Sequence, residues 1–504
     1  MVGQLKQKPL WIAGAAVVGT MVGIDALGHA LDGLGSALPV GLAIAAGALW
    51  WRRRSGVIAP KAISKPVVSS RDRVVAAIAR TAAILERLQE EAPEGAIAAL
   101  PLGGWRDRLA TLMADVDRPE TTVAIVGGAG VGKSTLAKAL AIAEPKLSGF
   151  QWTDTASLFV GAEGTSEPEI DGDPARASLL AQTLGADVVL FVTAADLTAT
   201  EFDAIAALTA AERFPLVVFN KQDRYLPADR EAILTRLGHE LHGQIGRDRI
   251  VAIAAAPAPI KVRRHQIDGT VQEFMEQPAP DLLPLTGPLQ TLRTAQGDRL
   301  RWQTVARQTA AVQTELLTIL NGQRRSRAIG LIEQSQWIAG AAAFANPMPG
   351  LDLVATAAVN GQLVLEVGQI YQQKFSLDRA QGVAATLAEL LIKQGAVELA
   401  SQAIGSALKA NAVTYAVGGA VQGISAAYLT RIAGQSLIDL FEAKAIAELT
   451  GTATDDRWFA PERLTAAIAQ AVDRTRQGLN LQTFVQQALQ RLPQRPASTP
   501  TPAS

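Results

Sequence analysis

The stretch TTVAIVGGAGVGKSTLAKA, residues 121–139, decides the fold. It begins with a β-branched apolar run, Thr122 to Val126, of the kind that forms a buried parallel strand. A glycine-rich turn follows, and Ser134 to Ala143 then has the composition of a helix. The order of strand, turn and helix predicts an α/β domain in which the turn joins the strand to the helix.

The turn matches the P-loop pattern G-x-x-x-x-G-K-[ST]. Glycines let successive backbone N–H groups point into one concavity, and the helix that begins near Lys133 adds the positive end of its dipole. We expect Lys133 to reach the outer phosphates of a nucleotide and the Ser134 hydroxyl to bind a Mg²⁺ ion on those phosphates. The residues expected to line this cradle are Gly127, Gly128, Ala129, Gly130, Val131, Gly132, Lys133, Ser134 and Thr135. A glycine turn in another kind of α/β domain is the alternative.

A second polar element, Asn220-Lys221-Gln222-Asp223, follows the apolar run Pro215 to Phe219 and resembles the N-K-x-D element of GTPases. A carboxylate at Asp223 can accept two hydrogen bonds from guanine, whereas adenine offers no such pair of donors. We expect Asn220 to tie this element to the P-loop. The resemblance also implies that Ala255, just after an expected strand at Arg249 to Ala254, lies beside the base. A polar turn that caps a strand is the alternative.

The switch region departs from the pattern. Residues 154–158, DTASL, follow an expected strand at Phe150 to Asp154 and are similar to the D-T-[AP]-G-L element of Era and TrmE-like GTPases. This resemblance implies that Asp154 holds Mg²⁺ through water, although an ordinary residue at a strand end is the alternative. Ser157 replaces a flexible glycine, and Leu158 cannot orient an attacking water. The six residues 144–149 are too few for an ordinary first switch, so nucleotide binding is better supported than hydrolysis.

Composition limits the other functions. The 504 residues suggest about three domains, and 47 basic against 47 acidic residues give no overall field that would recruit nucleic acid. The absence of cysteine excludes disulfides and thiolate metal sites. His239 and His242 lack a third ligand nearby in sequence, so we expect them on a solvated helix face.

Residues 1–56 predict a transmembrane hairpin. The segments Pro9 to Ile24 and Gly33 to Trp51 contain no charged residue, although the first is marginal in length. Basic residues flank the two outer ends, at Lys6, Lys8 and Arg52 to Arg54, so both ends should be cytoplasmic. We therefore expect a bacterial cytoplasmic-type membrane, with lipid as a partner. A secretory signal and a buried soluble hairpin are the alternatives.

The rest of the chain should be helical apart from the α/β domain. A helix at Val67 to Glu91 is expected to space the domain from the membrane. A stalk should be broken at Pro284, Pro288 and near Gly297, and its Arg324, Arg325 and Arg327 should form either an anchor for anionic lipid or a solvated helix end. The predicted divisions are residues 1–56 (hairpin), 57–117 (amphipathic helical linker), 118–278 (α/β domain), 279–329 (stalk), 330–441 (helical domain), 442–492 (C-terminal helices) and 493–504 (disordered tail).

Residues 346–371, NPMPGLDLVATAAVNGQLVLEVGQIY, resemble the YcjF-like helical domain of unknown function that accompanies Era/TrmE-like GTPases. Two apolar helices, Leu331 to Ala345 and Leu351 to about Ile370, should flank its Asn-Pro-Met-Pro-Gly turn. The uncharged stretch Ala410 to Thr430 fits a packed bundle that touches the bilayer or a second hairpin. The expected fold is thus a P-loop GTPase domain of the α/β class plus an all-α helical domain and a transmembrane hairpin.

The leading hypothesis is a membrane-anchored protein that binds GTP or GDP with Mg²⁺ and hydrolyses GTP slowly with Lys133 and Asp154 in the catalytic site. Its nucleotide state would reposition the helical domain, and dynamin-like membrane remodelling is a bolder form of this idea. A non-catalytic nucleotide-binding scaffold is the alternative from another class. A nucleotide-gated transporter is less attractive, because the apolar segments lack ionisable residues. A second copy of the chain or an activating protein is a candidate partner.

Overall fold

A computed structural model describes residues 70–93, 97, 100–142, 147–155, 174–213, 215–265, 271–345, 351–393, 404, 418–452, 457–478 and 481–491. The expected transmembrane hairpin at 1–56 and the tail at 493–504 lie outside these residues. So do Ser157, Leu158 and the turn at 346–350.

Five parallel strands form the sheet of the α/β domain, in the order β2-β1-β3-β4-β5. Their bounds are Thr121–Gly127 (β1), Phe150–Asp154 (β2), Val188–Thr193 (β3), Leu216–Phe219 (β4) and Ile250–Ala252 (β5). Strand β1 lies between β2 and β3 and pairs with both, and Ile125 lies opposite both Asp154 and Leu190. All carboxyl ends therefore meet at one edge of the sheet, where the glycine turn follows β1.

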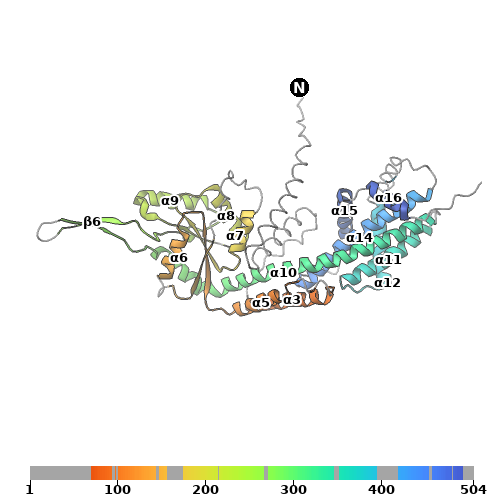
Figure 1. Cartoon of the computed structure of the whole chain (residues 1–504), viewed down its shortest axis with the longest axis horizontal. Helices are drawn as coiled ribbons and strands as arrows, with labels where there is room; N and C mark the ends of the chain where they lie inside the picture. Colours follow the sequence, from red (N-terminus) through yellow and green to blue (C-terminus); the bar gives the residue numbers. More distant parts are fainter. Residues whose placement is uncertain are drawn as a thin grey trace, which may run out of the picture. The chain divides into compact units, whose positions relative to one another are not determined.

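Helices cover both faces of this sheet (Figure 1). Alternate residues of β1 point to opposite faces, so Val123 and Ile125 pack into one cluster and Ala124 and Val126 into another. The helices of the domain are Lys133–Ile142 (α6), Pro174–Gln182 (α7), Ala199–Ala210 (α8) and Pro227–Glu240 (α9). One cluster contains α6 and the first turns of α10 (Leu283–Ala345), and the other contains residues of α7 and α8.

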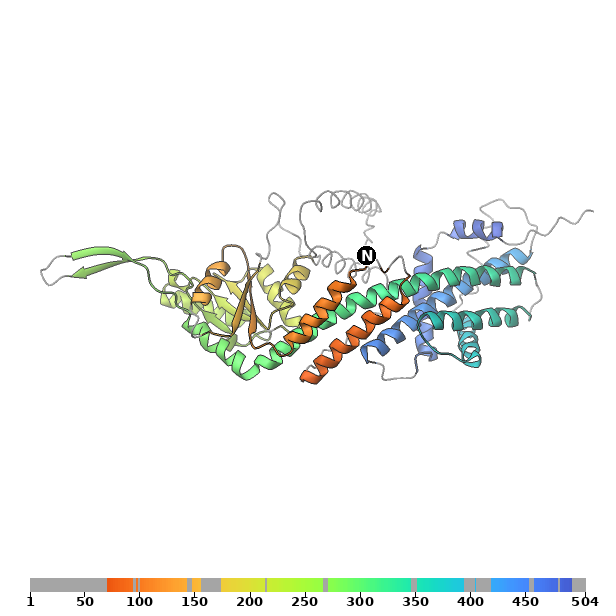
Figure 2. The ribbon, with the colours of Figure 1, turned by 60° about the horizontal axis from the view of Figure 1, so that its bottom comes forward.

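An antiparallel hairpin, Ile260–His265 (β6) and Val271–Glu276 (β7), was not predicted. Figures 1 and 2 show it projecting away from the parallel sheet. Its strands carry many charged residues, and Arg263 pairs with Glu273 across the hairpin at 2.6 Å. The strands therefore lack the simple apolar alternation that marks a half-buried strand.

The expected breaks in the stalk are wrong. Helix α10 runs without interruption through Pro288 and Gly297 and continues to Ala345. Figure 2 instead shows a sharp change of direction in the green N-terminal part of this helix. Proline and glycine commonly bend a helix without ending it. The helix expected at Leu331 to Ala345 is thus the last part of α10.

The predicted linker helix packs against α10 rather than acting as a free spacer. Helices α3 (Arg71–Glu91) and α5 (Leu102–Asp115) share a buried cluster with the middle of α10. Leu88 and Leu316 are both fully buried in it. The amphipathic pattern of α3 was therefore correctly recognised, but its partner is a helix of the same chain.

The remaining helices form a second core with the C-terminal part of α10. They are Leu351–Ile370 (α11), Leu377–Lys393 (α12), Gly418–Thr450 (α14), Pro461–Gly478 (α15) and Leu481–Arg491 (α16). The backbones of α10 and α14 approach closely, since a Cβ on Gly340 would lie 2.9 Å from the carbonyl oxygen of Gly423. Among the described helices, none combines the length and apolarity needed to cross a bilayer.

The clustered arginines Arg324, Arg325 and Arg327 of α10 do not form a lipid anchor or a solvated helix end. The Arg324 side chain is fully buried and donates two hydrogen bonds to the Glu91 carboxylate, at 2.6 and 2.9 Å. Arg327 reaches the same carboxylate at 3.1 Å, and Arg325 pairs with Glu442 of α14 at 3.0 Å. These ion pairs fix α10 to α3 and α14, and both expectations for the cluster are wrong.

Candidate functional site

The turn after β1 has the backbone that its glycines permit. Gly127, Gly130 and Gly132 have φ values of 154°, 71° and 95°, which L side chains rarely adopt. A Cβ on Gly127 would lie 2.3 Å from the carbonyl oxygen of Val192, and one on Gly132 would lie 2.5 Å from Nδ2 of Asn220. The turn is thus closed on one side by β3 and on another by the loop after β4.

Lys133 lies on the turn itself. Its side chain curls back, and Nζ donates to the carbonyl oxygens of Gly127 and Gly128 at 3.1 and 2.8 Å. Burial lowers the pKa of Lys133, and the negative charge of Asp154 opposes this shift. An ammonium held by neutral carbonyls can exchange them for a charged phosphate, which is the stronger acceptor.

Asn220 joins three parts of the site. The residue is 2% exposed, its Nδ2 donates to the Val131 carbonyl at 2.9 Å, and its Oδ1 accepts from the Ala255 amide at 3.0 Å. The prediction that Asn220 ties its loop to the glycine turn is confirmed. Ala255, itself 3% exposed, is held by the same side chain.

The next residues form a strained turn. Lys221 adopts a left-handed conformation with φ 63° and ψ 30°, and its Nζ donates to the Gly130 carbonyl at 2.6 Å. A 3-10 turn, Gln222–Arg224, follows. Asp223 is exposed, and its Oδ2 accepts from the Ala258 amide at 2.9 Å. The carboxylate that was predicted to read the base is therefore at the surface, held on one side by backbone.

The residues proposed for Mg²⁺ have suitable chemistry. Ser134 and Thr135 are exposed in the first turn of α6, and Asp154 is exposed at the carboxyl end of β2, electrostatically coupled to Lys133. Mg²⁺ prefers oxygen ligands and is usually bound by one or two protein groups together with phosphates. Over the described residues, no group of three or more His, Asp or Glu side chains could hold a metal.

Two polar contacts beside the site were missed at the sequence level. Glu201 is 6% exposed and completes a capping box with Thr198 at the start of α8. Its Oε1 lies 3.5 Å from where a Cβ of Gly128 would be. The T-x-x-E spacing could have predicted the cap. The other contact joins Gln222 to Asp281 at 2.9 Å, and no local pattern signals a pair so far apart in the chain.

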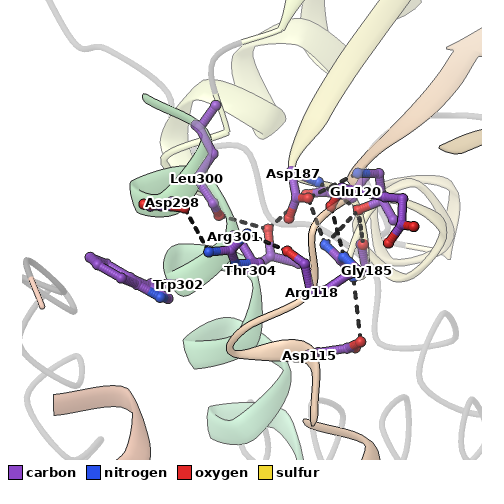
Figure 3. A network of polar contacts seen from close by, with 12 residues as sticks. Asp115, Arg118, Glu120, Gly185, Asp187, Asp298, Leu300, Arg301, Trp302 and Thr304 are labelled. Carbon is purple, nitrogen blue, oxygen red and sulfur yellow. Dashed lines mark hydrogen bonds and ion pairs between the residues drawn. The ribbon is translucent and has the colours of Figure 1, made fainter. Parts of the chain in front are cut away.

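At the amino ends of β1 and β3, α10 is hydrogen-bonded to the segments that precede these two strands (Figure 3). Arg301 donates to the carbonyls of Val116 and Arg118, and Thr304 donates to the Ala186 carbonyl at 3.1 Å. The buried Asp187 carboxylate accepts from Arg118 at 2.6 Å and from the Thr122 amide at 2.9 Å. Because Thr122 belongs to β1 and Asp187 precedes β3, these bonds anchor both strands beside α10.

His239 and His242 lie apart from the P-loop. They line a surface hollow of about 490 Å³ together with Gly238, Ile245 and Arg247. This hollow shares no residue with the glycine turn or with the Asn220 loop. Both side chains are exposed, as expected, but only His239 lies on a helix, because α9 ends at Glu240.

The C-terminal part of the chain matches a known family. Residues 307–477 match the family described as "Domain of unknown function (DUF697)". The match extends beyond the predicted helical domain at 330–441 on both sides. No curated protein is significantly similar to the chain in sequence.

Two solved structures show a distant likeness. One is described as "An oligomerised bacterial dynamin pair provides a mechanism for the long-range sensing and tethering of membranes"; it is 9% identical, with 84% of this chain and 79% of that chain covered and a TM-score of 0.24. The other is LeoA, a bacterial dynamin GTPase from ETEC, 10% identical, with 84% and 98% covered and a TM-score of 0.21. The family match thus covers about a third of the chain, on the C-terminal side of the five-stranded parallel sheet, and agrees with the expected YcjF-like helical domain.

Proposed function

We propose that this chain is a guanine-nucleotide-binding protein and a slow GTPase. The observation that carries this proposal is the position of Asn220, which bonds the P-loop carbonyl of Val131 and the amide of Ala255 with one side chain. A phosphate cradle and a base-reading loop must keep a fixed separation to hold one nucleotide. Asn220 supplies that spacing, and Asp223 supplies the acceptor for guanine.

In this function each side chain has a separate role. Lys133 leaves the carbonyls of Gly127 and Gly128 and donates to the phosphates, where its charge is better compensated. Ser134 and Asp154 would hold Mg²⁺, which supplies charge neutralisation on the phosphates when bound. Asp223 accepts from the base. The described residues supply binding and charge stabilisation, which are the larger part of phosphoryl-transfer catalysis.

Single-turnover hydrolysis of GTP by the full-length protein tests the enzymatic half of the proposal. We expect slow release of phosphate that stops when Lys133 is replaced by alanine, and the same assay with liposomes shows whether a bilayer accelerates it. Binding of GTP without any turnover under either condition would overturn the GTPase and favour a non-catalytic scaffold.

Attachment to a membrane is a separate proposal, which rests on the uncharged segments and basic flanks of residues 1–56. The cluster Arg324, Arg325 and Arg327 does not support this proposal, since its side chains pair with carboxylates. Carbonate extraction of membranes that contain the full-length protein tests it. Recovery in the pellet is expected, and recovery in the supernatant would contradict the anchor.

A further inference from the structure

Gln222 of the Asn-Lys-Gln-Asp element has no task in the proposed function, yet it is 6% exposed. Its Nε2 donates to Oδ2 of Asp281 at 2.9 Å. Its Oε1 lies 3.5 Å from the guanidinium of Arg230. A carboxylate only accepts and a guanidinium only donates, so both neighbours fix the same orientation of the amide.

Asp281 stands at the junction between the sheet and α10. Its backbone exchanges two hydrogen bonds with Ala254, at 2.9 and 3.1 Å, and so extends the edge of the sheet by one bridge. The helix begins two residues later, and its Leu285 and Leu289 are fully buried against the face below the P-loop. The position of the Asp281 carboxylate therefore depends on how the first turns of α10 pack against the sheet.

Gln222 in turn is next to the base-reading carboxylate. Its backbone amide donates to the Ile253 carbonyl at 3.1 Å, and Asp223 directly follows it in the 3-10 turn. The turn begins at Lys221 in a left-handed conformation, which is costly for a residue other than glycine and persists only where surrounding contacts hold it. The bond from Gln222 to Asp281 is one of those contacts.

We propose that Gln222 and Asp281 are positioning residues that hold the carboxylate of Asp223 in place for guanine, and that the docking of α10 thereby controls selectivity for the base. This inference rests on the proposed function, because it needs guanine to bind at Asp223. It makes the start of α10 a sensor of base occupancy. Guanine binding must stabilise the docking of α10 by the same free energy by which that docking favours guanine, since coupling between two equilibria is reciprocal.

The test compares the affinities of the full-length protein for GDP and IDP by calorimetry. Hypoxanthine lacks the exocyclic amine of guanine, so the ratio of the two affinities reports how well the carboxylate of Asp223 is placed. The wild type should prefer GDP by about tenfold or more, the value of one hydrogen bond to a charged acceptor. A substitution that only disturbs the structure of the site would weaken the binding of GDP and of IDP equally, and would leave the ratio of the two affinities unchanged.

Exchange of the donor and the acceptor makes the test specific. Gln222→Glu places a second carboxylate next to that of Asp281, so the two repel each other, and should reduce the ratio of GDP to IDP affinity by about tenfold. Asp281→Asn alone retains an acceptor and should keep the ratio. The double variant Gln222→Glu with Asp281→Asn restores a donor opposite an acceptor and should recover it. Gln381→Glu, the same change at an exposed position of α12, is the matched control.

The outcomes separate the two proposals. If the wild type binds neither GDP nor IDP, the proposed function fails. If the wild type prefers GDP but Gln222→Glu leaves the ratio unchanged, or the double variant does not recover it, only the present inference is overturned. Should Gln222→Glu fail to fold, Asp281→Ala replaces it, because it removes the acceptor from the exposed partner and should reduce the GDP to IDP ratio in the same way.

Hydrogen exchange tests the part of the inference that concerns α10. GDP should slow exchange of the backbone amides at residues 282–289 in the wild type and in Asp281→Asn, and this protection should be lost in Asp281→Ala. Equal exchange with and without GDP in the wild type would overturn the role of α10.

Discussion

Two groups of basic side chains, one at the glycine turn and the other at Arg324 and Arg325 of α10, have opposite surroundings. Lys133 and Lys221 donate to neutral backbone carbonyls of the glycine turn. Arg324 and Arg325 instead pair with the carboxylates of Glu91 and Glu442. A lysine can exchange a carbonyl for a phosphate without leaving a charge unpaired. An arginine that leaves a buried carboxylate would leave that charge unpaired, at a large cost in free energy. The partner of a cation, and not its sequence context alone, shows whether it is available for a ligand.

The largest expected effect concerns the arginine cluster. Glu91→Gln removes the charge that compensates the fully buried Arg324, and should lower the free energy of unfolding by about 3–5 kcal/mol. Urea unfolding followed by circular dichroism measures it. Glu90→Gln, at the exposed neighbour, is the control. Equal stability of the two variants would show that the ion pair between Glu91 and Arg324 contributes no more than a surface charge. The contrast between these arginines and the lysines of the P-loop would then not hold.

The next effect concerns the P-loop. Lys133→Ala should weaken nucleotide binding by about 100-fold or more, since it removes charged hydrogen bonds worth roughly 1.5–3 kcal/mol each. Lys138→Ala, on the exposed side of the same helix, should bind normally. Calorimetry with GDP compares them. Similar affinities for both variants would mean that Lys133 is a structural residue like Arg324.

Base selectivity should change at a third site. Asp223→Asn replaces an acceptor with a group that can also donate, so preference should move from guanine towards xanthine nucleotides by roughly tenfold or more. Competition between GDP and XDP measures the shift. Asp229→Asn, an exposed aspartate in the first turn of α9, should leave GDP preferred. An unchanged preference in Asp223→Asn would contradict the assignment of the base-reading residue.

The smallest effect is on pH dependence. Burial would raise the pKa of Glu91, but hydrogen bonds and charge from Arg324 and Arg327 hold it below its ordinary value of 4.5. Its contribution to stability should therefore be complete above about pH 4.5 and be lost as the pH falls through the pKa of the folded state.

Urea unfolding between about pH 7 and about pH 3 checks this prediction. The difference in stability between the wild type and Glu91→Gln should shrink on acidification. A constant difference would show that Glu91 does not act as an ionised partner.

The sequence predicted the parts of the fold that local patterns encode. The apolar run before the glycine turn became β1, and the runs before Asp154 and Asn220 became β2 and β4. The contact of Asn220 with the P-loop was also predicted, from the resemblance of residues 220–223 to the N-K-x-D element. The roles of Lys133, Ser134, Asp154, Asp223 and Ala255 in nucleotide binding stay predictions.

Other features depend on partners far along the chain. Glu91 and Arg324 are 233 residues apart, so the partners of the arginine cluster could not be predicted from the residues next to it in sequence. Pro288 suggested a break in α10, but packing of Leu285 and Leu289 against the sheet keeps the helix continuous around it. The hairpin β6–β7 was missed because its charged residues pair across strands and hide the alternation of a buried strand.

Calorimetric titration of the purified full-length protein with GDP, and in parallel with ADP, is the direct test of the proposed guanine site. The site built around Asn220 and Asp223 predicts saturable uptake of GDP in the presence of Mg²⁺ and much weaker or no uptake of ADP. Equal affinity for the two nucleotides, or no uptake of either, would contradict the proposed guanine site.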